Sequence, residues 1–273
     1  MILNDYLNIK NYGSKEFEYK ISFKDEAEFY KDIKDQEELY WWFGDGINEC
    51  DIELANIVAG FIRPHLPPYT KLILQTIYLK YQRQERPTMD CRASLLQSYI
   101  NQFNYDFIEV PYLHGEDTAQ KHYKNIIIYN FAEIFGKVHY FCDEITILPD
   151  NGALKLMTKE ENTWTDYENY YQQEREKIII CRKERTDEGI KTVMPKIKAQ
   201  GNKFAIVDDI IAGGDSIINV LKLLREQKPE AKITIHCIFL MSQYGYDNIK
   251  KQCGDIKIKP IFDLRNKIDN PFK

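Results

Sequence analysis

Apolar residues along most of the chain gather in short runs separated by polar segments. Seven runs of four to eight residues are rich in isoleucine, valine and leucine, which predicts the buried strands of parallel sheets. They are Leu72–Tyr78, Phe107–Val110, Ile126–Tyr129, Ile145–Leu148, Ile178–Cys181, Phe204–Val207 and Ile233–Leu240. Helical spacing of apolar residues occurs between them, over Ala93–Phe103, Gly152–Glu160 and Ser216–Gln227. The alternation predicts an α/β fold with parallel sheets.

One predicted strand, Phe204–Val207, leads into a polar turn that is suited to binding a small molecule. Asp208 and Asp209 follow the strand, and the turn Ala212-Gly213-Gly214-Asp215-Ser216 then opens a predicted helix. Carboxylates bind hydroxyl groups or metal ions, whereas the unpaired N–H groups of a first helical turn bind phosphate. A ribose carrying a 5-phosphoryl group offers both partners. The alternative is an ordinary strand-to-helix crossover with a polar loop, but paired carboxylates seldom serve packing.

Composition narrows the class of protein. The 273 residues are 44% hydrophobic, which is enough for a large core in one or two domains. A net charge of −5 without a Lys/Arg cluster argues against a nucleic-acid partner. The six cysteines are widely spaced without a Cys-x-x-Cys pair, which argues against a thiolate zinc site and favours buried free thiols. With a polar N-terminus and no segment of membrane-spanning length, we expect a soluble, cytoplasmic protein that has no membrane partner.

The turn after Phe204–Val207 and four segments before it resemble the sequence motifs of a known enzyme family. Val207-Asp-Asp-x-x-x-Gly-Gly resembles the phosphoribosyl-diphosphate motif of type I phosphoribosyltransferases and of ribose-phosphate pyrophosphokinases (PRPP synthetases). Upstream, in the family's order, are segments similar to the pyrophosphokinase adenine-binding, ATP-holding, ATP–magnesium and second phosphate-binding segments: Trp42–Gly46, Tyr81–Arg86, Pro111–Asp117 and Leu148–Lys155. The ordinary transferases lack the first three. The chain therefore resembles a divergent pyrophosphokinase over about residues 41–262.

This resemblance implies two tandem phosphoribosyltransferase-like (type I) parallel-sheet domains, residues 1–135 and 136–273, with the active site between them. The N-terminal domain would contribute the ATP site and the C-terminal domain the ribose-phosphate turn. Residues 1–40 are rich in Lys, Asp, Glu and Tyr and match no part of the family. An added hairpin or helix, an interface element and a solvated terminus all stay open for them.

The resemblance also implies how ATP is held. Phe43 would stack on adenine, Asp45 would accept from the exocyclic amine, and Arg83 and Gln84 would reach the nucleotide. In the family the adenine segment serves a neighbouring subunit, which implies a homo-oligomer. Clustered aromatic residues are also typical of a core or interface stripe, which is the alternative here. Ile47 replaces the acid that the family has after Asp-Gly, so one base contact is missing.

The cofactor implied is Mg²⁺, which bridges the phosphates of ATP and keeps most of its water. The resemblance places His114 and Asp150 closest to the metal, and Asp150, Asn151 and Gly152 in a diphosphate-binding loop. For His114 the alternative is a structural histidine that closes a strand. The polar neighbours that follow it favour the functional interpretation.

The resemblance implies two catalytic residues, Lys183 and Arg185, on a mobile loop after the strand Ile178–Ile180. Such a pair would neutralise the transferred group after loop closure; the alternative is a solvated basic turn. The implied reaction transfers the β,γ-diphosphate of ATP to the anomeric 1-hydroxyl of a ribose 5-phosphoryl compound and releases AMP. The substrates implied are therefore ATP and this small sugar phosphate.

The sequence of this turn differs from that of the family, which has Asp-Asp-x-x-Asp-Thr-Gly-Gly-Thr at these positions. Gly213 and Ser216 replace both threonines, and Asp215 introduces an acid. If Asp215 or Ser216 is the N-cap of the next helix, its side chain occupies N–H groups that a phosphate would use. This leads to the hypothesis that the acceptor is a 5-substituted ribose such as ADP-ribose, as in a phage-associated branch of the family. Two different functions stay open beside this one: a phosphoribosyltransferase that consumes PRPP, and a catalytically silent regulatory subunit.

Overall fold

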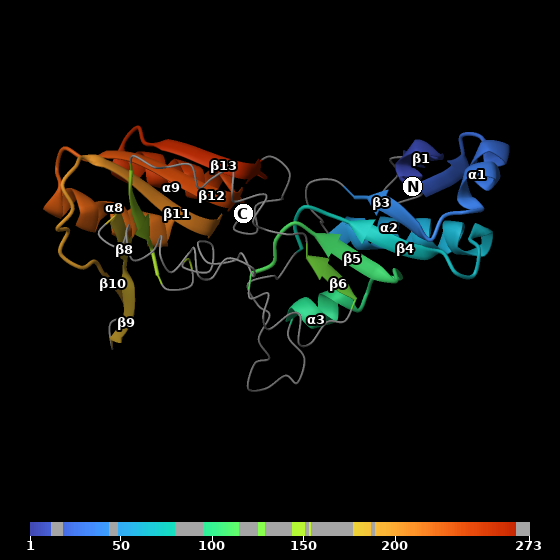
Figure 1. The fold of residues 1–273 in the computed structure, drawn as a ribbon, viewed down its shortest axis with the longest axis horizontal. Helices are drawn as coiled ribbons and strands as arrows, with labels where there is room; N and C mark the ends of the chain where they lie inside the picture. The colour runs from blue at the N-terminus through green and yellow to red at the C-terminus, as the bar shows by residue number, and fades with distance from the viewer. Residues whose placement is uncertain are drawn as a thin grey trace. The chain divides into compact units, whose positions relative to one another are not determined.

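A computed structural model describes residues 1–11, 19–43, 49–79, 95–114, 125–128, 144–150, 153, 177–186 and 189–265 of the chain. The chain divides into two compact units, Met1–Asn130 and Phe131–Lys273. Each unit has its own parallel sheet (Figure 1). The domain boundary expected between residues 135 and 136 lies outside the described residues and stays a prediction.

The first unit is built on a four-stranded parallel sheet in the order β3-β4-β5-β6. These strands are Glu38–Trp42, Lys71–Gln75, Phe107–Val110 and Ile126–Ile128. Helix α2 (Glu49–Ile62), with the short 3₁₀ turn η2 (Arg63–His65), joins β3 to β4, and α3 (Leu95–Ile100) lies between β4 and β5. The helices and one face of the sheet share a core whose fully buried members include Leu72, Leu74, Ile108, Ala55, Val58 and Leu96.

The N-terminal segment is part of this core. It forms the 3₁₀ turn η1 (Leu3–Asp5), the hairpin β1–β2 (Leu7–Asn11 and Tyr19–Phe23) and the helix α1 (Glu26–Ile33). Leu3 and Phe29 are fully buried in the core of the first unit. The segment therefore forms a hairpin and a helix. The alternative of a solvated terminus, which composition left open, is wrong.

The second unit has a five-stranded sheet in the order β13-β12-β11-β7-β8, with every neighbouring pair parallel. In chain order the strands are Ile145–Leu148, Ile178–Ile180, Lys203–Ile211, Lys232–Leu240 and Lys257–Asp263. Helices α8 (Asp215–Gln227) and α9 (Gln243–Cys253) connect β11 to β12 and β12 to β13. Right-handed crossovers in one direction put both helices on the same face. Their buried residues join the sheet in one core that includes Phe204, Ile206, Ile235, Val220, Leu221 and Ile249.

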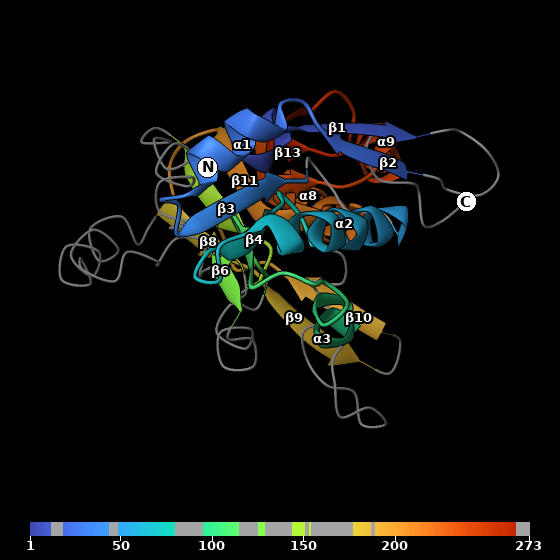
Figure 2. The same ribbon diagram turned by 90° about the vertical axis from the view of Figure 1, so that its right-hand side faces the viewer.

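An antiparallel hairpin, β9 (Arg182–Thr186) and β10 (Gly189–Val193), connects β8 to β11. It extends away from the sheet of the second unit in both views (Figures 1 and 2). The segment expected to be a loop or a basic turn is therefore a strand. Pairing with β10 gives its polar residues backbone partners that the apolar pattern does not reveal.

The strand order of the second unit fixes where a ligand can bind. Numbered along the chain, its strands follow the order 2-1-3-4-5, so the order reverses between β7 and β11. In open parallel sheets, ligands bind beyond the carboxyl ends of the strands at such a reversal, because the connecting segments diverge there. A ligand site is therefore expected among the residues that follow β7 and β11.

The α/β class with parallel sheets is confirmed, and all seven predicted strands are present. Two predicted helices correspond to α3 and α8, and the helix predicted over residues 152–160 lies outside the described residues. Cys181 and Cys237 are buried free thiols, as expected, and Cys253 is free and half-buried. No helix in the described part of the chain is long and apolar enough to cross a membrane.

Two helical glycines give a test of the packing. A Cβ on Gly245 of α9 would stand 2.0 Å from the carbonyl oxygen of Ala212, whereas a Cβ on Gly60 of α2 would meet no atom within 4 Å. We expect Gly245→Ala to lower the midpoint of thermal unfolding, because the backbone at Ala212 must move. Gly60→Ala should stabilise by about 0.5–1 kcal/mol through helix propensity. Calorimetry checks this, and effects of the same sign would contradict the packing described.

Candidate functional site

Four charged residues meet at the carboxyl edge of the second unit, beside the reversal in strand order. Asp150 lies two residues beyond β7, and Asp208 and Asp209 lie in the last part of β11. Lys183 comes from β9, directly after β8. The residues predicted to bind ribose, diphosphate and the transferred group are thus brought together here in one place.

The two aspartates of β11 are fixed by the backbone that follows them. Oδ1 of Asp208 accepts from the N–H of Asp209 at 2.9 Å, and Oδ1 of Asp209 accepts from the N–H of Ile210 at 2.7 Å. Each carboxylate therefore bends towards the carboxyl end of the strand. Asp209 is buried, and Asp208 is half-buried.

Lys183 pairs with the carboxylate that follows β7. Its Nζ lies 2.5 Å from Oδ2 of Asp150, and about a third of each side chain is exposed. A pair this open contributes little to stability, because water screens it. The main effect of this ion pair is that it holds the positive charge of Lys183 beside the carboxylates.

The charges at this edge change the protonation of Asp208. Burial raises the pKa of its carboxyl, and the negative charges of Asp209 and Asp150 add to the effect. The N–H of Asp209 and the cation of Lys183 act in the opposite direction, but the pKa stays well above its usual value. A site of this kind favours ligands that bring a cation or hydroxyl donors, since these relieve the repulsion among the carboxylates.

The glycine turn between β11 and α8 does not have the cap that the residue types predict. Gly214 is the N-cap of α8, with φ +84°, and no side chain accepts from the first turn of the helix. The expectation that Asp215 or Ser216 is the N-cap is wrong, because the left-handed conformation at Gly214 starts the helix one residue earlier. Asp215 is instead the first helical residue. The first N–H groups of α8 thus lack a side-chain cap, as a phosphate site requires.

Helix α9 contacts this turn, which no sequence pattern predicts. Ser242 Oγ donates to the carbonyl of Ala212 at 2.7 Å, and Asn248 Nδ2 donates to the carbonyl of Gly213 at 3.0 Å. A Cβ on Gly214 would lie 2.9 Å from Cγ1 of Ile249, so the turn also packs closely on the helix. No local motif marks either polar residue, since each acts on a turn about thirty residues away.

The donor set suits Mg²⁺ as a cofactor shared with phosphates. Among the described residues no group of three or more His, Cys, Asp and Glu side chains is arranged to hold a metal ion. Mg²⁺ needs no such group, because it binds through one or two carboxylates together with substrate phosphates. The carboxylate of Asp150 fits this requirement. His114 belongs to the first unit, so its role as a second ligand stays a prediction.

The predicted ATP-binding residues are only partly described. Phe43 follows β3, and its ring meets that of the buried Trp41 edge-on at 4.9 Å. Trp42 is 43% exposed, which leaves it the more accessible aromatic ring of this segment. Asp45, Arg83, Gln84, Asn151 and Gly152 lie outside the described residues, as does the side chain of Arg185. Their roles stay predictions.

The chain is similar to known proteins in two comparisons. Residues 176–264 match the phosphoribosyl transferase domain family. A ribose-phosphate pyrophosphokinase from Thermoplasma volcanium is 24% identical over 217 residues, which are 77% of this chain and 65% of that protein. The chain thus spans just under two thirds of the length of this relative. The matched domain contains Lys183, Asp208, Asp209 and the glycine turn, and the parallel α/β sheet is consistent with it.

The raised pKa of Asp208 predicts a gain in stability when its charge is removed. The folded chain holds this proton more tightly than the unfolded chain, so stability falls as pH rises from about 4 towards the raised pKa. We expect Asp208→Asn to raise the midpoint of thermal unfolding by about 2–4 °C near pH 8, which corresponds to about 1 kcal/mol. The gain should shrink towards zero as the pH approaches about 4. Thermal unfolding across this pH range measures it.

Asp247→Asn serves as the control, because Asp247 is an exposed acid of the same unit. It should leave the midpoint nearly unchanged throughout. A gain for Asp208→Asn that does not depend on pH would mean that packing, and not the charge, is responsible.

Proposed function

We propose that the protein is an ATP-dependent diphosphokinase that transfers the β,γ-diphosphate of ATP to the anomeric 1-hydroxyl of a ribose 5-phosphoryl compound and releases AMP. The observation that carries this proposal is the meeting of Asp150, Lys183 and the Asp208–Asp209 pair at the reversal in strand order, next to an uncapped helix N-terminus. The similarity to a ribose-phosphate pyrophosphokinase supports the choice of reaction.

Each of the predicted residues has a separate role in binding the substrates. Asp208 and Asp209 accept the ribose 2- and 3-hydroxyls, which removes part of the repulsion between the two carboxylates. The N–H groups of residues 213–216 bind the 5-phosphoryl group at the start of α8. Mg²⁺, with Asp150 and His114 as the residues that would hold it, supplies charge neutralisation for the ATP phosphates. Phe43, Asp45, Arg83 and Gln84 are proposed to hold the nucleotide.

The transfer itself needs positive charge and alignment more than covalent chemistry by the protein. The anomeric oxygen forms a bond to Pβ, the bond from Pβ to the α–β bridging oxygen breaks, and its electron pair leaves with AMP. The hydroxyl proton passes to water. Lys183, released from Asp150 when ligands arrive, faces the oxygens of the transferred group, and Arg185 is proposed to act beside it. The hairpin β9–β10 carries both residues, so its movement would bring them to the phosphates.

The turn favours an acceptor in which the 5-phosphate is esterified, such as ADP-ribose. Oδ2 of Asp215 would lie 3.4 Å from a Cβ on Gly213, so the carboxylate borders the turn itself. A terminal phosphate carries a charge near −2, whereas a phosphodiester-type group carries −1. At about 6 Å and an effective dielectric constant of about 20–40, the additional charge costs about 1–3 kcal/mol. The charge of Asp215, and not an N-cap at Asp215 or Ser216, is thus the reason for the preference.

A phosphoribosyltransferase that consumes PRPP is the second candidate. The observation in its favour is that residues 176–264, which include the same turn, match the phosphoribosyl transferase domain family. Such an enzyme needs a nucleophilic acceptor and no ATP. A catalytically silent regulatory subunit is the third, because Gly213 and Ser216 replace both family threonines, although Lys183, Asp208 and Asp209 are retained.

Product analysis distinguishes these functions. Purified protein is incubated with ATP and Mg²⁺ and either ribose 5-phosphate or ADP-ribose, and AMP and sugar products are measured by mass spectrometry. We expect AMP together with a sugar heavier by one diphosphate, with ADP-ribose as the better acceptor. A further mixture contains PRPP and a nucleophilic acceptor but no ATP, and pyrophosphate release there would indicate the transferase. Absence of products from every mixture would indicate the silent subunit.

The acceptor preference should follow the charge of the turn. Replacing Asp215 with Gly and Gly213 with Thr removes the acid and restores one hydroxyl donor, so the kcat/KM ratio of ribose 5-phosphate to ADP-ribose should rise about tenfold or more. Asp247→Gly, which removes an exposed acid of the same unit, should leave the ratio unchanged. An unchanged ratio in the double variant would mean that the charge of Asp215 does not select the acceptor.

A further inference from the structure

Two side chains of α9 hold consecutive carbonyl groups of the phosphate turn. Ser242 Oγ donates to the carbonyl oxygen of Ala212, and Asn248 Nδ2 donates to that of Gly213. The described chain contains no cis peptide bond. In a trans peptide the C=O of one residue and the N–H of the next point in opposite directions. With both carbonyls turned towards α9, the N–H groups of Gly213 and Gly214 therefore point away from this helix.

The orientation of the Asn248 amide is set by its own helix. Gln252 Nε2 donates to Asn248 Oδ1 at 2.8 Å, so the oxygen of the amide is occupied and its NH₂ group faces the turn. The same NH₂ group lies 3.5 Å from Oδ1 of Asp215. Asn248 thus contacts two groups of the turn: the carbonyl of Gly213, which must point away from a bound phosphate, and the carboxylate of Asp215.

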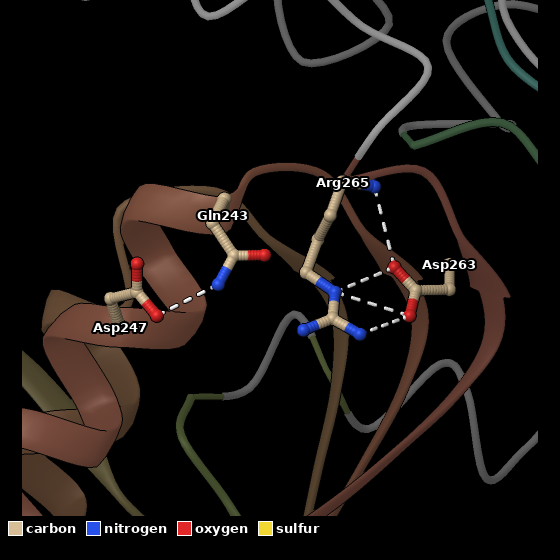
Figure 3. Close-up of polar contacts among 4 residues, drawn as sticks. All are labelled: Gln243, Asp247, Asp263 and Arg265. Carbon is tan, nitrogen blue, oxygen red and sulfur yellow. Dashed lines mark hydrogen bonds and ion pairs between the residues drawn. The ribbon is translucent and has the colours of Figure 1, made fainter.

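Helix α9 is held by contacts at its start and along its length. Ser242 is its N-cap and accepts from the N–H of Gly245 at 3.0 Å. The guanidinium of Arg265 lies 4.2 Å from the ring centre of Tyr246 on this helix. Arg265 also binds both oxygens of Asp263, at the end of β13 (Figure 3). The helix is thereby tied to the sheet on one side and to the turn on the other.

We propose that Ser242 and Asn248 are positioning residues that preorganise the turn as a binding site for the 5-phosphoryl group of the acceptor. They orient two successive N–H groups, which together form a concave anion site, towards the ligand. Asn248 also keeps the carboxylate of Asp215 on the side of α9. The fixed amides serve the role that a hydroxyl group at residue 213 would otherwise have. This inference rests on the proposed function for the identity of the ligand.

Variants of Asn248 test the inference. Asn248→Ala removes the donor, and Asn248→Asp places an acceptor and a negative charge against the carbonyl of Gly213 and against Asp215. We expect KM for the acceptor to rise about fivefold to tenfold in the first variant and more in the second, which reflects the loss of a hydrogen bond and the added repulsion. KM for ATP should change less than twofold. A structural defect alone would instead lower kcat or raise both KM values.

Gln243→Glu is the matched control. Gln243 donates to Oδ1 of Asp247 at 2.7 Å on the same helix, so this variant also converts an amide into a carboxylate beside an aspartate (Figure 3). It changes the net charge by the same amount but does not touch the turn. Acceptor KM in this variant should match that of the wild type, and thermal unfolding of all variants verifies that they fold.

Calorimetric titration of ribose 5-phosphate and of ADP-ribose separates this inference from the proposed reaction. If the wild type forms no AMP but binds either ligand, and Asn248→Asp weakens the binding about tenfold or more while Gln243→Glu does not, the reaction is wrong and the inference holds. Equal binding by Asn248→Asp and the wild type overturns the inference, whatever the reaction. Failure of the wild type to bind either ligand overturns it as well.

Discussion

The repulsion among carboxylates at one edge of a parallel sheet is the constraint on which the second unit depends. Asp150, Asp208 and Asp209 gather where the strand order reverses, and Lys183 is the cation paired with Asp150. Burial of Asp208 makes this repulsion stronger, because nearby charges interact more in a poorly solvated site. The fold supplies the free energy to hold these groups together, and a ligand with hydroxyl groups and a bound cation recovers part of it.

How much of the fold could be predicted depends on where each strand lies in its sheet. Ile145–Leu148 and Phe204–Val207 are central strands whose residues are all buried, so their apolar runs are continuous and easily found. β13 is an edge strand with alternating lysines and with Pro260, which an edge tolerates because the missing N–H faces no neighbour. β3 carries the exposed Glu38 and Trp42 at its ends, and β9 is polar throughout, so neither has the pattern of a buried strand.

The candidate site could likewise be predicted only in part. Asp208, Asp209 and the glycine turn are adjacent in sequence, and a strand that delivers them to a helix is a local arrangement that residue types can indicate. The contributions of Ser242 and Asn248 arise only when α9 packs against the turn, so no local pattern predicts them. The N-cap at Gly214 could not be predicted either. Asp215 and Ser216 are better caps by residue type, and the close approach of Ile249 explains why the left-handed glycine is there.

The acid in the turn is therefore compatible with phosphate binding, but only with a limited charge. Two oriented N–H groups and the start of α8 supply partial positive charge, while Asp215 supplies a full negative charge at the border of the same turn. A hydroxyl donor at residue 213 would strengthen binding of any phosphate, whereas an acid at residue 215 weakens binding of a dianion more than that of a monoanion. Glycine at residue 213 thus weakens phosphate binding in general, and aspartate at residue 215 is the residue that discriminates between the two charges. A phosphate that is already esterified meets the smaller repulsion and loses the least.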